Sequence, residues 1–269
     1  MGYQHLEVER DGHIALLWLN RPEKRNALSG DMWEDIPAAM AELDADDSVR
    51  VVILAGRGPA FTVGIDIELL ASMQPASESQ ASANMKLYRL IQRMQDTATC
   101  FSYSPKPVIA AVHGYCLGAG MDLITACDVR LASEDATFSI RETRMGLVAD
   151  VGTLQRLPAI VGPGHTAELA FTGRDIDAGQ AMAIGLLNGV HPDPAATLQA
   201  AHDLAVEIAE NSPLVVRGIK KVLAANDGRT VEQALDYVAQ WNASYLISND
   251  LMEAVAAFME KRKPDFTGH

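Results

Sequence analysis

The sequence is poor in cysteine and in positive charge. Its three cysteines, Cys100, Cys116 and Cys127, match no metal-binding spacing, and we expect them to be reduced thiols. The chain carries 35 acidic residues against 22 lysines and arginines, which gives a formal net charge of −13. Such a chain repels phosphate backbones, so we expect no nucleic-acid partner.

Long apolar runs are also missing. No segment reaches the roughly 20 apolar residues of a membrane span. The N-terminal residues lack the basic segment and apolar stretch of a signal peptide, and the last residues form no peroxisomal address. We therefore expect a cytoplasmic protein with no membrane partner. Its hydrophobic content of 48% supports a packed globule.

Apolar strands and helical patterns alternate in the first 150 residues. The segments Arg50–Ala55 and Pro107–His113 are continuous apolar runs typical of buried strands. The repeated order of strand, strand and helix predicts an α/β fold. Helical patterns dominate after about Gly152, so we divide the chain into a core at residues 1–200 and a helical region at residues 201–269. We expect the second region to serve oligomerisation.

Several helix boundaries can be predicted from capping and loop-forming residues and from the spacing of apolar residues. A helical pattern follows a cap at Ser29, and the Ser/Ala/Gln-rich stretch Gln74–Ala83 predicts a surface loop before a helix at Asn84–Tyr103. Separate helices are expected at Thr153–Ile160 and His165–Phe171.

Two glycine-containing loops, Ala60–Asp66 and Gly114–Gly120, each join a buried strand to the start of a helix. The first N–H groups of a helix have no internal partner, so Ile65 and Ala119 are candidate donors. Two such donors converging on one oxygen would form an oxyanion hole. The glycine spacing matches neither a dinucleotide fingerprint nor a Walker loop. Plain turns and tight helix–strand packing are the structural alternatives.

Three carboxylates stand among apolar neighbours: Asp122, Glu142 and Asp150. Apolar surroundings raise the pKa of a carboxyl group, which suits it to general acid–base chemistry. The alternatives are structural. Glu142 could cap a helix or pair with Arg141 or Arg144, Asp150 could be a helix N-cap, and Asp122 could interact with a helix dipole.

Five motifs, in the same order along the chain, resemble the enoyl-CoA hydratase/isomerase (crotonase) superfamily. They are Asn20–Leu28, Phe61–Asp66, His113–Gly120, Phe171–Ala178 and Ala257–Pro264.

Within that family, Met121–Arg130 and Gly146–Pro158 resemble the Δ3,5-Δ2,4-dienoyl-CoA isomerases. Ordinary hydratases usually carry Glu at the position of Asp122 and Gly at that of Asp150.

The resemblance implies a crotonase-like spiral of strand-strand-helix units with a helical C-terminal trimerisation region. It also implies a homotrimer or homohexamer that acts on acyl-CoA thioesters in fatty-acid β-oxidation. The expected reaction shifts 3,5-dienoyl-CoA to 2,4-dienoyl-CoA through a dienolate stabilised by the oxyanion hole. No cofactor is expected, because coenzyme A is part of the substrate, and no metal is expected, because no His/Cys/Asp cluster suggests one.

The resemblance also assigns roles to residues. Ile65 and Ala119 would supply the oxyanion-hole N–H groups. Asp150 would take the C2 proton and Glu142 would protonate C6, an order that stays open, while Asp122 supports both. The positions expected to bind the substrate or its CoA moiety are Arg25, Ala27, Val63, Gly64, Asp66, Gly118, Gly120 and Lys261.

Two other functions fit the same motifs. An enoyl-CoA hydratase would use Asp122 and Glu142 to hold a water and would leave Asp150 without a role. A non-catalytic crotonase-like protein would bind acyl-CoA without turnover. His113, beside the second loop, is expected to bond to backbone rather than to act in catalysis.

Overall fold

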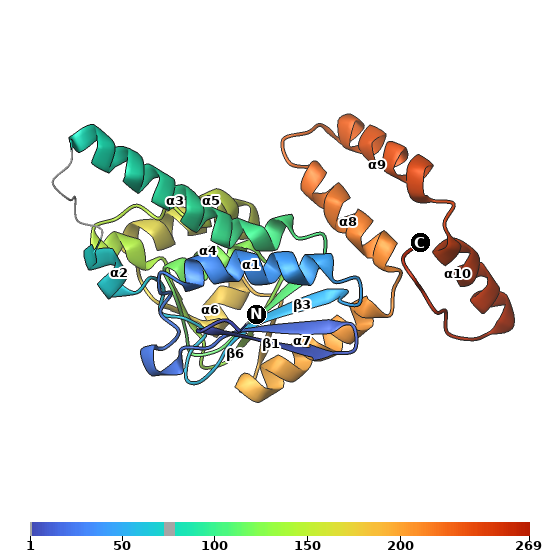
Figure 1. Cartoon of the computed structure of the whole chain (residues 1–269), viewed down its shortest axis with the longest axis horizontal. Helices are drawn as coiled ribbons and strands as arrows, with labels where there is room; N and C mark the ends of the chain where they lie inside the picture. Colours follow the sequence, from blue (N-terminus) through green and yellow to red (C-terminus); the bar gives the residue numbers. More distant parts are fainter. Residues whose placement is uncertain (1, 73–78) are drawn as a thin grey trace.

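The strands form one large and one small sheet in the computed structural model, which describes residues 2–72 and 79–269 (Figure 1). The six-stranded sheet has the order β1-β2-β3-β4-β6-β9. Its strands are β1 (Leu6–Asp11), β2 (Ile14–Leu19), β3 (Val51–Gly56), β4 (Val108–Val112), β6 (Val129–Ser133) and β9 (Gly189–His191). β1 and β2 form an antiparallel hairpin, and the other pairs are parallel. The three-stranded sheet contains β5 (Tyr115–Leu117), β7 (Thr137–Ser139) and β8 (Ile176–Asp177).

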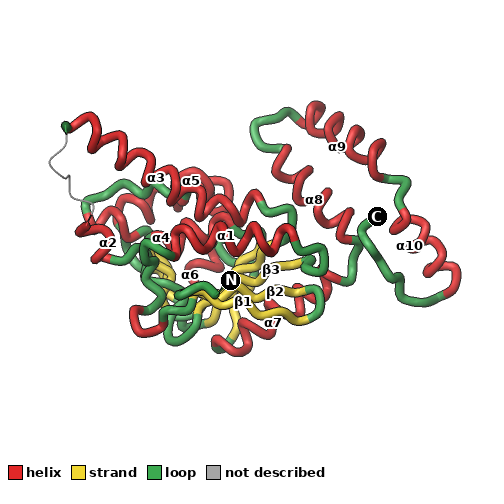
Figure 2. Tube along the Cα trace, in the orientation of Figure 1, coloured by secondary structure: helices red, strands yellow, loops and turns green. Residues whose placement is uncertain are grey.

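Helices cover both faces of the large sheet. Figure 2 shows one group of helices above the strands and α7 below them. The core helices are α1 (Met32–Ala45), α2 (Ile67–Ser72), α3 (Gln80–Tyr103), α4 (Ala119–Ala126), α5 (Thr153–Thr172), α6 (Ala178–Ala183) and α7 (Pro194–Ala209). Two 3₁₀ turns, η1 (Pro22–Lys24) and η2 (Arg141–Met145), complete the core. Within the described ranges, no helix is both long enough and apolar enough to cross a bilayer.

Alternation along the strands explains the two hydrophobic layers. In β2, Leu17 and Leu19 pack in the larger cluster under the helices, whereas Leu16 and Trp18 pack on the opposite side with α7. Successive side chains of a strand point to opposite faces, so one apolar run serves both layers. The predicted α/β class is confirmed.

Several predicted boundaries need correction. The helix expected after Ser29 begins at Met32, whose N–H makes a long 3.5 Å hydrogen bond to Ser29 Oγ. α3 begins at Gln80, so the end of the loop expected at Gln74–Ala83 is helical, while residues 74–78 lie outside the described residues. The two helices expected between residues 153 and 171 are present as the two parts of α5, which the non-helical φ and ψ angles of Gly162 separate, in agreement with the prediction. The strands β5 and β9 were not predicted because each spans only three residues.

Three helices project from the core as a C-terminal arm (Figure 1): α8 (Pro213–Ala225), α9 (Val231–Tyr245) and α10 (Asn249–Glu260). The expected domain boundary at residue 200 falls inside α7. Ala201, Ala205 and Ala209 of that helix are buried against the sheet, so α7 belongs to the core. The arm therefore begins near Ser212. Its role in oligomerisation stays a prediction.

Candidate active site

A cavity of about 400 Å³ lies among α3, α4, η2 and the segment that precedes α5. Its lining includes both candidate N–H donors, Ile65 and Ala119, and all three candidate carboxylates, Asp122, Glu142 and Asp150. The structure thus brings together five residues that are spread over 86 positions of the sequence. Val63, Gly64 and Gly118 line the same cavity.

The first glycine loop reaches the second because Gly64 has no side chain. Gly64 has a φ of +93°, and a Cβ added there would lie 3.3 Å from the Ala119 nitrogen. The backbone on either side of Ile65 is anchored, since Leu28 N–H donates to the Gly64 carbonyl and Asp66 N–H to the Leu28 carbonyl. The Ile65 N–H itself has no acceptor among the described residues. It is therefore free to bind a ligand oxygen.

The second loop supplies the other free donor. Gly118 precedes α4 with a φ of +54°, and a Cβ added there would lie 3.1 Å from Glu142 Oε1. Ala119 opens α4, and its N–H likewise has no acceptor in the described part of the chain. Gly120 differs, because an added Cβ would lie 2.8 Å from the Thr62 side chain. Gly120 allows tight packing and does not line the cavity, so the structural alternative holds at this position.

Asp122 is buried on α4, with 1% of its surface exposed. Its Oδ1 accepts hydrogen bonds from both the N–H and the Oγ1–H of Thr153, each at 2.6 Å. Thr153 opens α5, whose N-cap residue Gly152 has no side chain to cap the helix. Burial raises the pKa of Asp122 to about 6, while the Thr153 bonds and the positive charge of Arg156 oppose the rise. Asp122 therefore caps a neighbouring helix and also faces the cavity.

Glu142 lies in η2, and its Oε2 is buried with no hydrogen-bond partner. The expected alternative, a pair with Arg141 or Arg144, does not occur among the described contacts, because Arg141 donates to Asp175 instead at 2.7 Å. Burial raises the pKa of Glu142 to about 7, and the negative charge of Asp122 adds to the rise. Glu142 can therefore carry a proton near neutral pH.

Asp150 lines the cavity and is exposed to solvent. It is not the N-cap of α5, since Gly152 occupies that position. Gln95 of α3 donates to the Asp150 carbonyl at 2.7 Å and anchors the segment. Partial burial raises the pKa of the Asp150 carboxyl group. An exposed carboxylate beside a buried protonated acid is an arrangement suited to taking a proton at one position and giving one at another.

The apolar wall of the cavity combines sequence neighbours of Asp150 with residues of distant helices. Leu147 and Val148 line the cavity, but they are 44% and 76% exposed in the single chain. The buried part of the wall includes Val151, which follows Asp150, and also Trp33 of α1 and Met94 of α3. These helices are distant in sequence from the carboxylates, so the pattern around Asp150 could not reveal them.

Beside the cavity, η1 and its flanking residues present a cluster of cations. Arg21 pairs with the buried Asp66 at 2.5 Å and also donates to the Ala27 carbonyl at 3.1 Å. The hydrogen bond from Arg21 lowers the pKa of Asp66. Arg25 is exposed and lies 5.7 Å from the Tyr115 ring centre, and it has no acidic partner among the described residues. Asp66 and Ala27 thus hold the loop in place, whereas Arg25 remains available to an anion.

Two further positions lie outside the cavity. Lys261 follows α10 at the tip of the arm, where its φ is +59°. Lys261 does not line the cavity, and its expected contact with CoA stays a prediction. His113 bonds through Nε2 to the Gly58 carbonyl at 2.9 Å, in agreement with the structural role expected for it.

Sequence reasoning missed Thr153, which makes two of the shortest contacts in the site. A glycine followed by threonine at a helix start, Gly152-Thr153, was the available signal. It was not recognised because the helix is capped by a residue 31 positions away rather than by a local side chain.

The comparisons with known proteins agree with this geometry. The family model described as enoyl-CoA hydratase/isomerase matches residues 9–269. A peroxisomal Δ(3,5)-Δ(2,4)-dienoyl-CoA isomerase from Arabidopsis thaliana is 45% identical over 270 residues, which cover 98% of this chain and 97% of the relative. The mitochondrial isomerase of the same name from Mus musculus is 42% identical and covers 97% of this chain and 81% of the relative.

A solved structure shares the fold. The crystal structure of an enoyl-CoA hydratase from Bacillus anthracis matches with a TM-score of 0.90 and 30% sequence identity, covering 99% of this chain and 100% of that one. The predicted crotonase-like fold is therefore confirmed. This hydratase is less similar in sequence than the two isomerases.

Proposed function

The chain belongs to the enoyl-CoA hydratase/isomerase family, and from that premise we propose that it isomerises 3,5-dienoyl-CoA to 2,4-dienoyl-CoA. The observation that carries the proposal is the cavity that contains two free backbone N–H groups and three carboxylates. The pathway expected for this reaction is fatty-acid β-oxidation.

The two N–H groups stabilise the charge that forms on the thioester oxygen. Removal of a C2 proton places negative charge on that oxygen, conjugated with the two double bonds. Ile65 and Ala119 donate to it from a partly enclosed cavity. One donor of this kind contributes about 3–4 kcal/mol of transition-state stabilisation.

The carboxylates move the protons. Asp150, exposed to solvent, is the base that takes the proton from C2. Glu142, protonated because burial raises its pKa to about 7, donates a proton to C6. The double bonds then stand at positions 2 and 4. Asp150 now carries a proton and Glu142 has lost one, and exchange with water restores both groups without net change.

Hydration is less well supported by the same geometry. A hydratase needs two carboxylates to hold one water, and here Thr153 engages Oδ1 of Asp122 and leaves only Oδ2 for such a contact. Hydration would also leave Asp150 without a role. A binding protein without turnover would have no use for an acid whose pKa lies near neutrality.

The test is to offer 3,5-dienoyl-CoA and 2-trans-enoyl-CoA separately and to follow which one is consumed. We expect isomerisation of the first, and Asp150→Asn should lower kcat by about 10²- to 10⁴-fold, since a positioned base contributes that much. Glu134→Gln, which removes an exposed carboxylate outside the cavity, is the matched control and should retain activity. Preferred hydration of the enoyl substrate, or full isomerase activity in Asp150→Asn, would show the proposal to be wrong.

Substrate binding and assembly complete the proposal. Arg25 is suited to a CoA phosphate because it is exposed and lacks an acidic partner among the described residues. Lys261 would reach the CoA of a neighbouring subunit in a homotrimer or homohexamer. The exposed apolar residues of the arm support such an assembly. The cytoplasmic location stays a prediction, and the two isomerase relatives are named for the peroxisome and the mitochondrion.

A further inference from the structure

One residue beside the cavity takes no part in the proposed proton transfers. It nevertheless makes two of the shortest hydrogen bonds in this region. Thr153 is 1% exposed and donates both of its available hydrogens to a single oxygen, Asp122 Oδ1. A plain helix cap needs only the N–H bond, because only backbone donors are left unpaired at a helix start. The additional bond from the hydroxyl group therefore calls for a second explanation.

The two bonds fix the orientation of the Asp122 carboxylate. Both are short, both end on Oδ1, and both donors belong to the first residue of α5. The other oxygen, Oδ2, accepts no hydrogen bond from the described residues, and Asp122 lines the cavity. Thr153 thus decides which oxygen is held by the protein and which is left for the site.

The groups that face Asp122 come from four elements. Glu142 approaches from η2, Asp150 from the segment before α5, and the Arg156 guanidinium from α5 itself, while the buried Cys116 thiol lies on β5. Arg156 supplies the positive charge among them. Its side chain is also held by Thr99, to which it donates at 2.7 Å.

The charge of Asp122 acts on Glu142. Besides Asp122, Glu142 faces Asp150 and has Arg141 as its chain neighbour, and the charge of Arg141 is engaged by Asp175. An ionised Asp122 disfavours a second negative charge at Glu142, so it helps to keep a proton there.

We propose that Thr153 is a positioning residue, which holds Asp122 as an oriented anion and through it keeps Glu142 in its proton-carrying form. The inference deepens the proposed isomerase function and rests on it, because it is Glu142 that donates the proton to C6.

The direction of the expected effect follows from the donors. Thr153→Val keeps the N–H and the shape of the side chain but removes the hydroxyl donor. The ionised form of Asp122 then loses a hydrogen bond, so its pKa rises and more of it is neutral near pH 7. With less negative charge nearby, the pKa of Glu142 falls. The alkaline limb of the kcat profile, which requires protonated Glu142, should move to lower pH by about half a unit or more.

The decisive experiment titrates Glu142 directly in the intact protein. The protonated carboxyl band that Glu142→Gln removes is followed by infrared difference spectroscopy in wild type, Thr153→Val and Thr153→Ser. We expect a lower midpoint in Thr153→Val and a midpoint near that of wild type in Thr153→Ser, which restores the hydroxyl group. If Thr153→Val does not fold, Thr153→Ala takes its place, since it also keeps the N–H.

A double-variant cycle separates this role from simple helix capping. Asp122→Asn should also lower the Glu142 midpoint, and adding Thr153→Val should cause little further shift. An unchanged midpoint in Thr153→Val, an equal shift in Thr153→Ser, or a full shift that persists in the Asp122→Asn background would overturn the proposal. The infrared titration needs no turnover. A wild-type protein that leaves 3,5-dienoyl-CoA unchanged would therefore count against the proposed function alone.

Discussion

The cavity and the C-terminal arm each contain an acid with a buried carboxyl oxygen, but the two acids differ in their hydrogen bonding. In the arm, Asp250 is 2% exposed and accepts hydrogen bonds from Ser212 Oγ and from the N–H groups of Thr267 and Gly268. Although its burial alone would raise its pKa, these bonds lower the pKa of Asp250 overall. In the cavity, Glu142 has a buried oxygen without a partner and a pKa raised to about 7.

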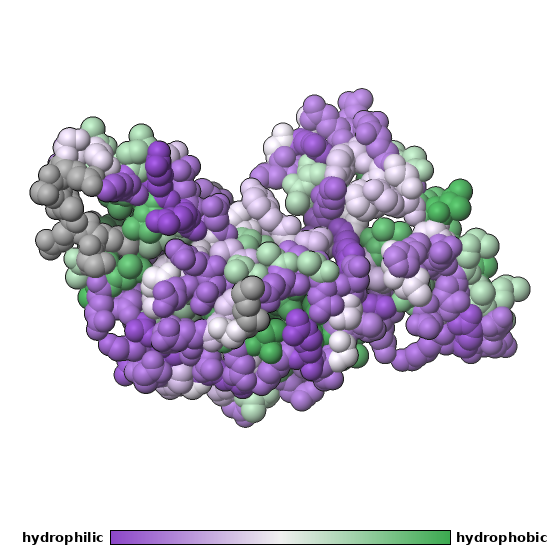
Figure 3. Space-filling model, in the orientation of Figure 1, coloured by the Kyte–Doolittle hydropathy of each residue, from purple (hydrophilic) through white to green (hydrophobic). Residues whose placement is uncertain are grey.

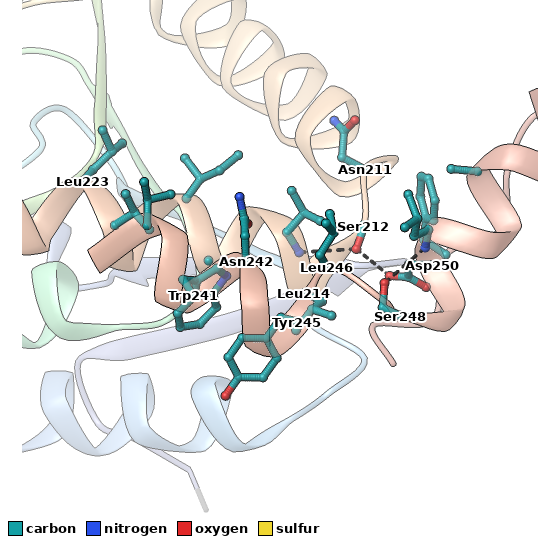
Figure 4. A pocket seen from close by; sticks show the side chains of 18 residues that line it. Asn211, Ser212, Leu214, Leu223, Trp241, Asn242, Tyr245, Leu246, Ser248 and Asp250 are labelled. Carbon is teal, nitrogen blue, oxygen red and sulfur yellow. Dashed lines mark hydrogen bonds between the residues drawn. The ribbon is translucent and has the colours of Figure 1, made fainter. Parts of the chain in front are cut away.

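The difference is the one expected between a structural acid and the catalytic acid that we propose Glu142 to be. A buried carboxylate that is fully hydrogen-bonded stabilises the fold as an anion. A buried carboxyl group that lacks donors holds a proton more readily and is available for chemistry. Figure 4 shows the first case, with Ser212 and Asp250 joined across the junction that opens the arm.

The two regions also differ in how their apolar side chains are covered. All six residues of β2 and of β3 are buried, whereas α9 has no buried residue. Figure 3 shows hydrophobic residues at the surface of the arm. The large apolar residues exposed there include Ile219, Leu223, Leu235, Ile247, Phe258 and Met259. The central strands therefore bury their apolar residues within one chain, while the arm leaves many of its apolar residues exposed.

The largest effect should come from the arm surface. Phe258, 83% exposed, would be buried between subunits in the proposed assembly. Phe258→Asp should abolish the assembly, because an unpaired carboxylate at an apolar interface costs several kcal/mol. Light scattering of the purified protein would show the mass fall toward that of a single chain. Ala195→Asp adds the same charge at an exposed position of the core and should keep the mass of wild type. Unchanged mass in Phe258→Asp would remove this residue from the interface.

The next largest effect should be a loss of stability when Asp250, the hydrogen-bonded acid of the arm, is replaced. Asp250→Asn should lower the free energy of unfolding by about 2–3 kcal/mol at neutral pH, because bonds to a charged acceptor are replaced by fewer and weaker ones. Since the folded-state pKa of Asp250 is lowered, its contribution is present above its unfolded pKa of about 4 and is lost as the pH falls further. Urea unfolding at pH 7 and fixed protein concentration measures it. Asp265→Asn, which changes an exposed residue of the tail after α10, is the control. Equal stability of the two variants would contradict the stabilising role of the hydrogen bonds to Asp250.

The smallest effect should come from Glu142, whose replacement should raise the free energy of unfolding rather than lower it. The folded-state pKa of Glu142 is raised to about 7, so the wild-type protein loses stability as the pH rises from about 4.5 through 7. Glu142→Gln has no such loss and should be more stable than wild type at pH 8, by roughly 1–3 kcal/mol. The advantage should vanish near pH 4. Urea unfolding of both proteins at the two pH values gives the comparison. A Gln variant that is less stable than wild type at pH 8 would contradict the raised pKa of Glu142.

Much of the fold could be predicted because its signals are local. The apolar runs of β3 and β4 and the helical spacing of the C-terminal region depend on residues close together in the chain. The boundaries that failed depend on contacts at a distance. β9 has only three residues and pairs with β6, which lies more than 50 residues earlier.

In the candidate site, too, the features with local signals could be predicted and those that depend on distant contacts could not. The loops around Gly64 and Gly118 could be identified because a glycine between a strand and a helix marks a close approach of the backbone. The partner of Asp122 could not, because the bond to Thr153 joins helices that begin 34 residues apart.

The sequence by itself determined the α/β class, the two donor loops and the identity of the three acids, since each depends on residue type and short-range order. Only the tertiary structure decided which acid keeps a proton. That outcome depends on burial, on the nearby charge of Asp122 and on the absence of a donor to Glu142 Oε2 among the described residues. These are properties of the space around a side chain, and they arise only once distant helices have packed together.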